Sequence, residues 1–157
     1  ILRPKNFGPR FRPSGPVDFA GPDRHQRRMV QTLLLVGLGG ALGAMARYLT
    51  VVGAARLFGP GFPAGTLAVN VLGSFLIGVL AVAMLGPRGA SPAAAFLLVG
   101  VLGGFTTFSA FSLDALKLWQ AGQAGLAGAY VVASVGLSLA GVAAGAAAGA
   151  ALRGGPG

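Results

Sequence analysis

Four long apolar runs constrain the fold of this chain more than any other feature of its sequence. They cover residues 30–52, 65–85, 93–118 and 126–152, and the links between them are short. An α-helix needs ~20 apolar residues to cross the hydrocarbon core of a bilayer, and each run exceeds that length. We therefore predict an all-α integral membrane protein with four transmembrane helices, embedded in the lipid bilayer of the cell membrane.

The polar residues exclude several classes of function. The net charge of +9 is one that nucleic-acid-binding proteins often carry. However, seven of the twelve basic residues lie in residues 1–28 and the rest of the chain is apolar, so we expect no nucleic-acid partner. The chain has no cysteine, one histidine (His25) and, after residue 28, one carboxylate (Asp114). These residues cannot assemble a usual catalytic triad or a transition-metal cage, and we expect that the chain is not an enzyme.

Residues 1–28 differ from the apolar body. They are basic and polar and contain five prolines, a composition typical of a disordered segment. Met29 stands where the apolar body begins. We interpret 1–28 as a disordered tail and 29–157 as a four-helix transmembrane domain. Our hypothesis is that Met29 is the natural start and the tail a non-native extension.

The third apolar run contains an unusual polar centre. Two adjacent glycines, Gly103 and Gly104, precede two adjacent threonines, Thr106 and Thr107. Each glycine weakens a helix by about 1 kcal/mol relative to alanine. Polar, breakable backbone at bilayer depth is tolerated where it is buried in protein or lines a wet cavity. We therefore predict a weak point in the third helix at this polar centre, and we treat it as a candidate functional site.

The basic residues between the apolar runs are evenly divided between the two membrane faces. Arg88 and Arg153 lie on one side, whereas Arg56 and Lys117 lie on the other, with Arg47 near the boundary. The positive-inside rule therefore has almost no bias to act on. Our hypothesis is that such a chain inserts in both orientations (dual topology), which would permit an antiparallel homodimer.

Polar side chains on the second and fourth runs are candidates for an ion pathway. Asn70 lies in the middle of the second run, where its amide either makes an interhelical hydrogen bond or lines a pore. Tyr130, Ser134 and Ser138 are spaced by four residues. They therefore form one stripe of about 12 Å along a helix, which favours a polar track over isolated hydroxyls bonded to their own helix.

Two aromatic and two charged residues allow both a structural and a functional interpretation. Phe108 and Phe111 share a helix face, and they either pack or offer positive ring edges to a dehydrated anion. Arg47 either extends to the membrane interface, or supplies positive potential to an anion vestibule, or pairs within a dimer. For Asp114 we favour a local helix pair with Lys117, three residues later.

Three motifs on consecutive runs resemble the CrcB/Fluc family of fluoride channels across nearly all of 29–157. They are GGALGAMARY at 39–48, GTLAVN at 65–70 followed by GSF at 73–75, and GGFTTFSAFS at 103–112. The resemblance implies a passive fluoride-selective channel that exports fluoride from the cytoplasm, built as an antiparallel homodimer with two pathways.

The resemblance also implies that the third helix is broken at its centre, at Gly103 to Thr106, and it implies roles for individual residues. A structural sodium ion at the dimer centre would be held by the backbone carbonyls that match Gly103 and Thr106. The fluoride pathway and its vestibule would be formed by the matching residues Asn70, Phe108, Phe111, Tyr130, Ser134, Ser138 and, at the vestibule, Arg47. The family has glutamate where this chain has Asp114, so no role is transferred there.

Two other functions fit parts of the sequence. A small dual-topology multidrug carrier also has four short helices, but it needs a carboxylate in the first helix, which this chain lacks. A structural membrane or DNA-associated protein would account mainly for the basic tail.

Overall fold

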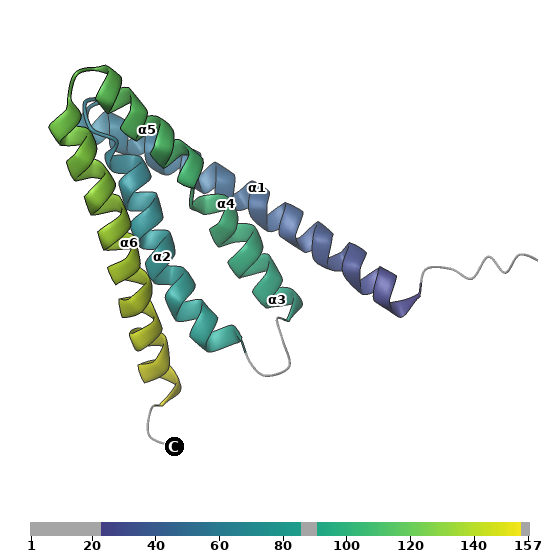
Figure 1. Ribbon diagram of the computed structural model, residues 1–157. Helices are drawn as coiled ribbons and strands as arrows, with labels where there is room; N and C mark the ends of the chain where they lie inside the picture. The colour runs from purple at the N-terminus through teal and green to yellow at the C-terminus, as the bar shows by residue number, and fades with distance from the viewer. Residues whose placement is uncertain (1–22, 86–90, 155–157) are drawn as a thin grey trace, which may run out of the picture.

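A computed structural model describes residues 23–85 and 91–154, and all regular structure in them is helical. Four helical spans make up the fold (Figure 1). The first, second and fourth are the helices α1 (Arg24–Phe58), α2 (Ala64–Met84) and α6 (Ala124–Arg153). The third span, Pro92–Gln120, is divided into α3 (Pro92–Ala94), η1 (Ala95–Leu102), α4 (Gly103–Phe105) and α5 (Phe108–Gln120).

All four spans are long and apolar enough to cross a membrane. The four predicted transmembrane helices are therefore confirmed, and the chain is a multi-pass membrane protein. One end of the bundle gathers the end of α1, the start of α2, the end of α5 and the start of α6, at the top of Figure 1. The C-terminus lies at the opposite end, where α2 ends and the third span begins.

The first helix begins earlier than the sequence predicted. Asp23 is its N-cap, and its side chain accepts a hydrogen bond of 2.7 Å from the backbone N–H of Gln26. Such a cap satisfies one of the free N–H groups at a helix start. Residues 24–28, which we assigned to the disordered tail, therefore belong to α1, and the remainder of the predicted tail, residues 1–22, lies outside the described part of the chain.

Helices α2 and α6 run side by side and touch through their backbones (Figure 1). Gly141, Gly145 and Gly149 form the α6 side of this contact. A methyl group added at Gly149 would lie 2.8 Å from the carbonyl oxygen of Val79, and one at Gly145 would meet the carbonyl of Phe75. Small residues allow this close approach in membranes, where apolar side chains gain little by leaving lipid. This glycine face therefore packs within one chain.

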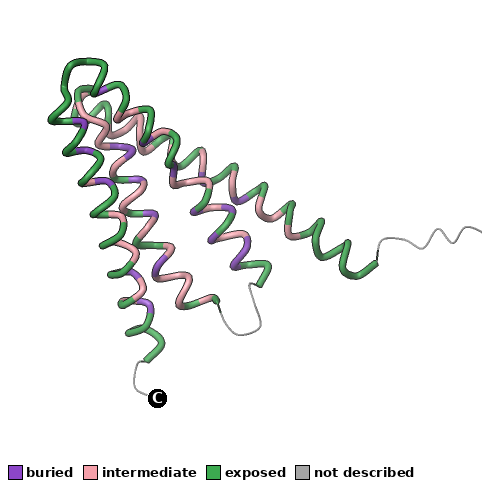
Figure 2. Tube along the Cα trace, viewed as in Figure 1, coloured by how far each residue is buried: buried purple, intermediate pink, exposed green. Residues whose placement is uncertain are grey.

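Helix α1 packs on the third span through a second set of small residues. A methyl group at Gly39 would lie 2.6 Å from the carbonyl oxygen of Phe96, and one at Gly43 would meet that of Val101. Gly104 approaches the backbone of Gly40 in the same way. The N-terminal half of α1 diverges from the other spans and is mostly exposed in this single chain (Figure 2).

Candidate functional site

The third span loses its helical conformation at two residues, Thr106 and Thr107. Thr106 has a ψ of 155°, and Thr107 has φ and ψ of −154° and 119°, which are extended values. Gly103, in contrast, keeps helical angles of −63° and −35°. The interruption therefore begins at Thr106, the last residue of the predicted break at Gly103 to Thr106, and extends to Thr107, whereas Gly103 remains helical. The glycines serve the contact with α1 instead.

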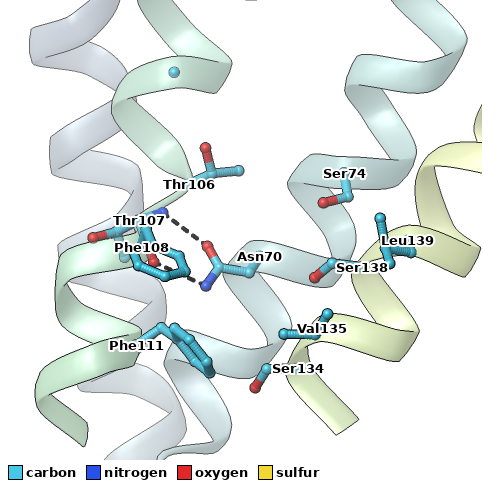
Figure 3. A pocket seen from close by; sticks show the side chains of 11 residues that line it. Asn70, Ser74, Thr106, Thr107, Phe108, Phe111, Ser134, Val135, Ser138 and Leu139 are labelled. Atoms are coloured by element: carbon cyan, nitrogen blue, oxygen red, sulfur yellow. Dashed lines mark hydrogen bonds between the residues drawn. The ribbon is translucent and has the colours of Figure 1, made fainter. Parts of the chain in front are cut away.

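The side chain of Asn70 explains where the interruption falls. The N–H of Thr107 donates to Oδ1 of Asn70 at 2.8 Å, and Nδ2 of Asn70 donates to the carbonyl of Thr107 at 3.0 Å (Figure 3). One side chain on α2 thus satisfies both backbone polar groups of a non-helical residue. Without such a partner, each group would carry the cost of a buried unsatisfied polar group, about 1–3 kcal/mol.

Two backbone carbonyls lose their usual donors at the interruption. In a continuous helix the N–H of Thr107 would bond to the carbonyl of Gly103, and that of Ala110 to the carbonyl of Thr106. Here the Thr107 N–H donates to Asn70, while the Ala110 N–H donates to Oγ1 of Thr107, the N-cap of α5, at 3.2 Å. The predicted sodium ligands are therefore two carbonyls that have been released from helical hydrogen bonding.

A cavity of about 490 Å³ lies beside the interruption, between α2, the third span and α6 (Figure 3). It brings together seven of the predicted site residues. Its full lining is Asn70, Ser74, Gly103, Thr106, Thr107, Phe108, Phe111, Ser134, Val135, Ser138 and Leu139. An amide, several hydroxyls and two phenyl rings therefore face one space that has no charged side chain on its wall.

The two phenylalanines form one contact but differ in exposure. Their ring centroids lie 5.4 Å apart and the rings are tilted by 50°. Phe111 is 8% exposed and belongs to the core, whereas Phe108 is 78% exposed in the single chain. Phe108 therefore borders the open side of the cavity.

The hydroxyl stripe on α6 reaches the cavity only in part. Ser134 and Ser138 line it, whereas Tyr130 lies next to it, fully buried, with its ring 5.5 Å from that of Phe111. Among the described residues, the buried hydroxyls of Tyr130 and Ser134 lack a hydrogen-bond partner of ordinary geometry. Thr66 and Ser134 are neighbours of the Tyr130 hydroxyl. Of the two, only Ser134 lines the cavity, so its hydroxyl can donate to a ligand there.

Arg47 and Asp114 lie at a second cavity, of about 320 Å³, which runs along α5. The predicted pair between Asp114 and Lys117 is wrong. Oδ2 of Asp114 accepts a hydrogen bond of 2.7 Å from the Thr66 hydroxyl on α2, and no ion pair joins it to Lys117 in the described part of the chain. The spacing of residues along α5 does not reveal that the Asp114 carboxylate lies within hydrogen-bonding distance of the neighbouring helix α2.

Three residues of these sites were missed from the sequence. Thr107 caps α5 and binds Asn70, Thr66 binds Asp114, and Ser74 lines the larger cavity. Thr66, Asn70 and Ser74 are spaced by four residues. They therefore share one face of α2, and this polar stripe was a signal that the sequence already contained.

Comparison with known proteins agrees with the arrangement. The family model described as CrcB-like protein, Camphor Resistance (CrcB), matches residues 34–153. The chain belongs to the CrcB family. A CrcB relative from Cereibacter sphaeroides, the fluoride-specific ion channel FluC, is 67% identical over 120 residues, which are 76% of this chain and 95% of the relative.

Two further CrcB relatives carry the same name. The protein from Rhizobium meliloti is 57% identical over 114 residues, which cover 72% of this chain and 91% of the relative. The one from Paracoccus denitrificans is 56% identical over 117 residues, or 74% and 93%. The residues matched by the CrcB family model, 34–153, include all those that line the two cavities and those at the interruption of the third span.

Replacement of Asn70 by alanine tests its role at the interruption. We expect the Asn70→Ala variant to exchange the Thr107 amide hydrogen about fivefold faster or more, because the loss of ~1–3 kcal/mol in protection corresponds to at least that factor. Hydrogen exchange by mass spectrometry over residues 103–111 measures it. Ser74→Ala, one turn further along the same helix, is the control and should leave the exchange unchanged. Equal exchange in the Asn70→Ala variant and the wild type would contradict the assignment.

Proposed function

We propose that this protein is a fluoride-selective ion channel that lets fluoride leave the cytoplasm passively and so lowers its toxicity. The observation that carries the proposal is the cavity beside Thr107, into which Asn70, Ser134, Ser138 and the Phe108–Phe111 pair converge. The CrcB relatives bear the name of a fluoride-specific ion channel and not that of an enzyme, which supports the same conclusion.

The chemistry of the cavity suits a small anion that has lost its water. Transfer of a small ion into a low-dielectric medium costs on the order of 20 kcal/mol in the idealised limit, so donors must replace most of the hydration. The unpartnered hydroxyl of Ser134, the amide of Asn70 and the positive edges of the phenyl rings provide such donors. No carboxylate lines this cavity to repel an anion or to exchange protons with it. Flow then follows the membrane potential, worth about 2.3 kcal/mol per charge per 100 mV.

Fluoride efflux from liposomes tests the function. We expect efflux from vesicles that contain the protein to exceed that from empty vesicles, and the double variant Phe108→Ile with Phe111→Ile to abolish it, because isoleucine offers no polarised ring edge. A fluoride electrode measures the release. Phe58→Ile, at the exposed end of α1, is the control and should keep normal flux. Efflux no faster than from empty vesicles, with the protein folded, would refute the function, and normal flux in the double variant would remove the rings from the pathway.

We also propose that two copies assemble as an antiparallel homodimer. Two exposed features support this: the apolar face of α1, which includes Leu38, Met45 and Leu49, and the 78% exposed ring of Phe108 at the open side of the cavity. The glycine faces of α1 and α6 are occupied by contacts within the chain, so the exposed face of α1 remains for a partner. Within residues 29–157 the basic residues of the two ends are nearly balanced, two (Arg88, Arg153) against two or three (Arg56, Lys117 and, near the boundary, Arg47), which favours insertion in both orientations.

Labelling of a single cysteine tests the orientation. The chain has no cysteine, so Gln120→Cys, at the exposed end of α5, introduces a unique thiol. In cells that express residues 29–157, we expect a membrane-impermeant reagent to label about half of the copies, because balanced loops give no preference. A permeant reagent gives the total as the control. Complete labelling or complete protection would rule out dual topology.

A sodium ion at the dimer centre completes the proposal. The carbonyls of Gly103 and Thr106 fit a hard cation because their usual helical donors are engaged elsewhere, by Asn70 and Thr107. In the described residues no cluster of three or more histidine or acidic side chains offers another site for a metal. A bound sodium would add a fixed positive charge beside the proposed anion pathway.

Thermal stability tests the sodium site without reference to flux. We expect the melting temperature in detergent to rise with sodium concentration and to saturate, and equal concentrations of potassium or a large organic cation to have less effect. A ligand at about 100 times its Kd stabilises a protein by roughly 2.7 kcal/mol. Thr106→Val should keep the response, because the proposed ligand is a backbone carbonyl and the Thr106 hydroxyl already bonds to Leu102. An identical melting temperature in all three salts would argue against the site.

A further inference from the structure

Most serine and threonine side chains of this chain are already hydrogen bonded to protein. Residues 23–85 and 91–154 contain eleven of them. Eight make hydrogen bonds, and the hydroxyls of Thr32, Thr50 and Ser112 donate to the carbonyl four residues earlier on their own helix. Such back-bonding is common for a hydroxyl in a membrane helix, because lipid offers it no partner.

The three exceptions all line the larger cavity. Among the described residues, the hydroxyls of Ser74, Ser134 and Ser138 make no hydrogen bond of ordinary geometry, and each of the three contributes to the wall of the space of about 490 Å³ beside Thr107. Ser134 and Ser138 belong to the hydroxyl stripe of α6, whereas Ser74 lies on α2 and has no assigned role. A hydroxyl at bilayer depth costs free energy unless a ligand or water binds it.

Ser74 belongs to a polar stripe on α2 that runs beside the stripe of α6. It follows Asn70 by four residues, so the two share a face and lie ~6 Å apart along the helix axis. Helices α2 and α6 begin at the same end of the bundle and run side by side (Figure 1). A methyl group added at Gly141, one turn beyond Ser138, would lie 3.8 Å from Cβ of Ser74. Figure 3 shows the hydroxyl oxygens of Ser74 and Ser138 on neighbouring helices, both directed to the side where Asn70 lies.

Both polar stripes end at this level. Four residues beyond Ser74 and Ser138 stand Gly78 and Val142, which offer no side-chain donor. A methyl group added at Gly78 would meet the carbonyl of Val142, so the two helices touch through their backbones there. The track of donors between α2 and α6 therefore has its closed end at Ser74 and Ser138.

We propose that Ser74 is a further anion-binding residue, whose hydroxyl acts with that of Ser138 to hold a small dehydrated anion at the closed end of this track. The inference rests on the proposed channel function and adds a donor from a second helix to it. An anion that has lost its water needs several donors at once, and a hydroxyl can rotate to direct its hydrogen at the ion. Neither hydroxyl has to give up a protein hydrogen bond first.

A packing role for Ser74 makes a different prediction. Ser74 and Gly78 are small residues four apart, and small residues at this spacing let membrane helices approach closely. Alanine is as small as serine. If Ser74 served only the contact with α6, Ser74→Ala would therefore leave both the fold and the efflux of fluoride unchanged.

The experiment compares the initial rate of fluoride efflux from liposomes that contain the full chain or its variants, at fluoride concentrations below saturation. We expect Ser74→Ala to slow efflux about tenfold, a factor equal to ~1.4 kcal/mol and near the lower value for a hydrogen bond to a charged group. Ser112→Ala is the matched control. It removes a hydroxyl that is bonded to the carbonyl of Phe108 and lines neither cavity, so efflux should stay normal.

Two further measurements test the shared site and the fold. The double variant Ser74→Ala with Ser138→Ala should depart from the product of the two single effects by more than about twofold, because independent sites multiply within that margin. Hydrogen exchange over residues 103–111 should be the same in Ser74→Ala and the wild type, which shows that the interruption at Thr107 is intact.

The outcomes separate the inference from the function. If the wild type releases fluoride and Ser74→Ala matches it, the binding role is refuted while the channel stands. Faster exchange over residues 103–111 in Ser74→Ala, or an equal loss of efflux in Ser112→Ala, also overturns the inference, since the loss then does not come from a missing donor in the cavity. Single effects that simply multiply overturn the shared site with Ser138. A wild type that releases no fluoride refutes the channel function, and the inference with it.

Discussion

The paired hydrogen bonds between Asn70 and the backbone of Thr107 determine the arrangement of the rest of the site. They stabilise an extended residue in the middle of a membrane span, where water cannot solvate free N–H and C=O groups. They also place the start of α5, so that Phe108 and Phe111 face the same cavity as Asn70 itself. One amide side chain thus positions the aromatic pair and releases the carbonyl of Gly103.

This arrangement requires that α2 be held firmly relative to the other spans. In a bilayer, apolar side chains gain little from contact with one another, so close packing and interhelical hydrogen bonds take over. Backbone contact through Gly145 and Gly149 fixes α6 against α2, and contact through Gly43 and Gly104 fixes α1 against the third span. The hydrogen bond from Thr66 to Asp114 joins α2 to α5 at one end of the bundle. Asn70 is therefore presented from a rigid frame.

Sequence reasoning identified the parts of this structure that depend on local or averaged properties. Run lengths predicted the four spans, and motif and spacing selected seven residues that now share one cavity. The errors arose where a specific contact between different helices determines the local structure. The resemblance placed the helix break at Gly103 to Thr106, which includes Thr106 but not Thr107, whose extended backbone is bound by Asn70 on another helix. Local spacing paired Asp114 with Lys117, but Thr66 takes the carboxylate. The dimer and its sodium ion involve a second copy, so they stay predictions.

The glycine contacts also set how freely different parts of the chain can vary over evolutionary time. Every substitution of glycine adds at least one carbon atom, and at Gly43 and Gly145 that atom would meet a backbone carbonyl, which cannot rotate away as a side chain can. Gly37, Gly53 and Gly136 lie on the same two helices but face open space in the single chain. Substitution is therefore restricted at the buried glycines, because a side chain there would clash with backbone. At the outward-facing glycines, the lipid or partner chain that contacts them determines which side chains are tolerated.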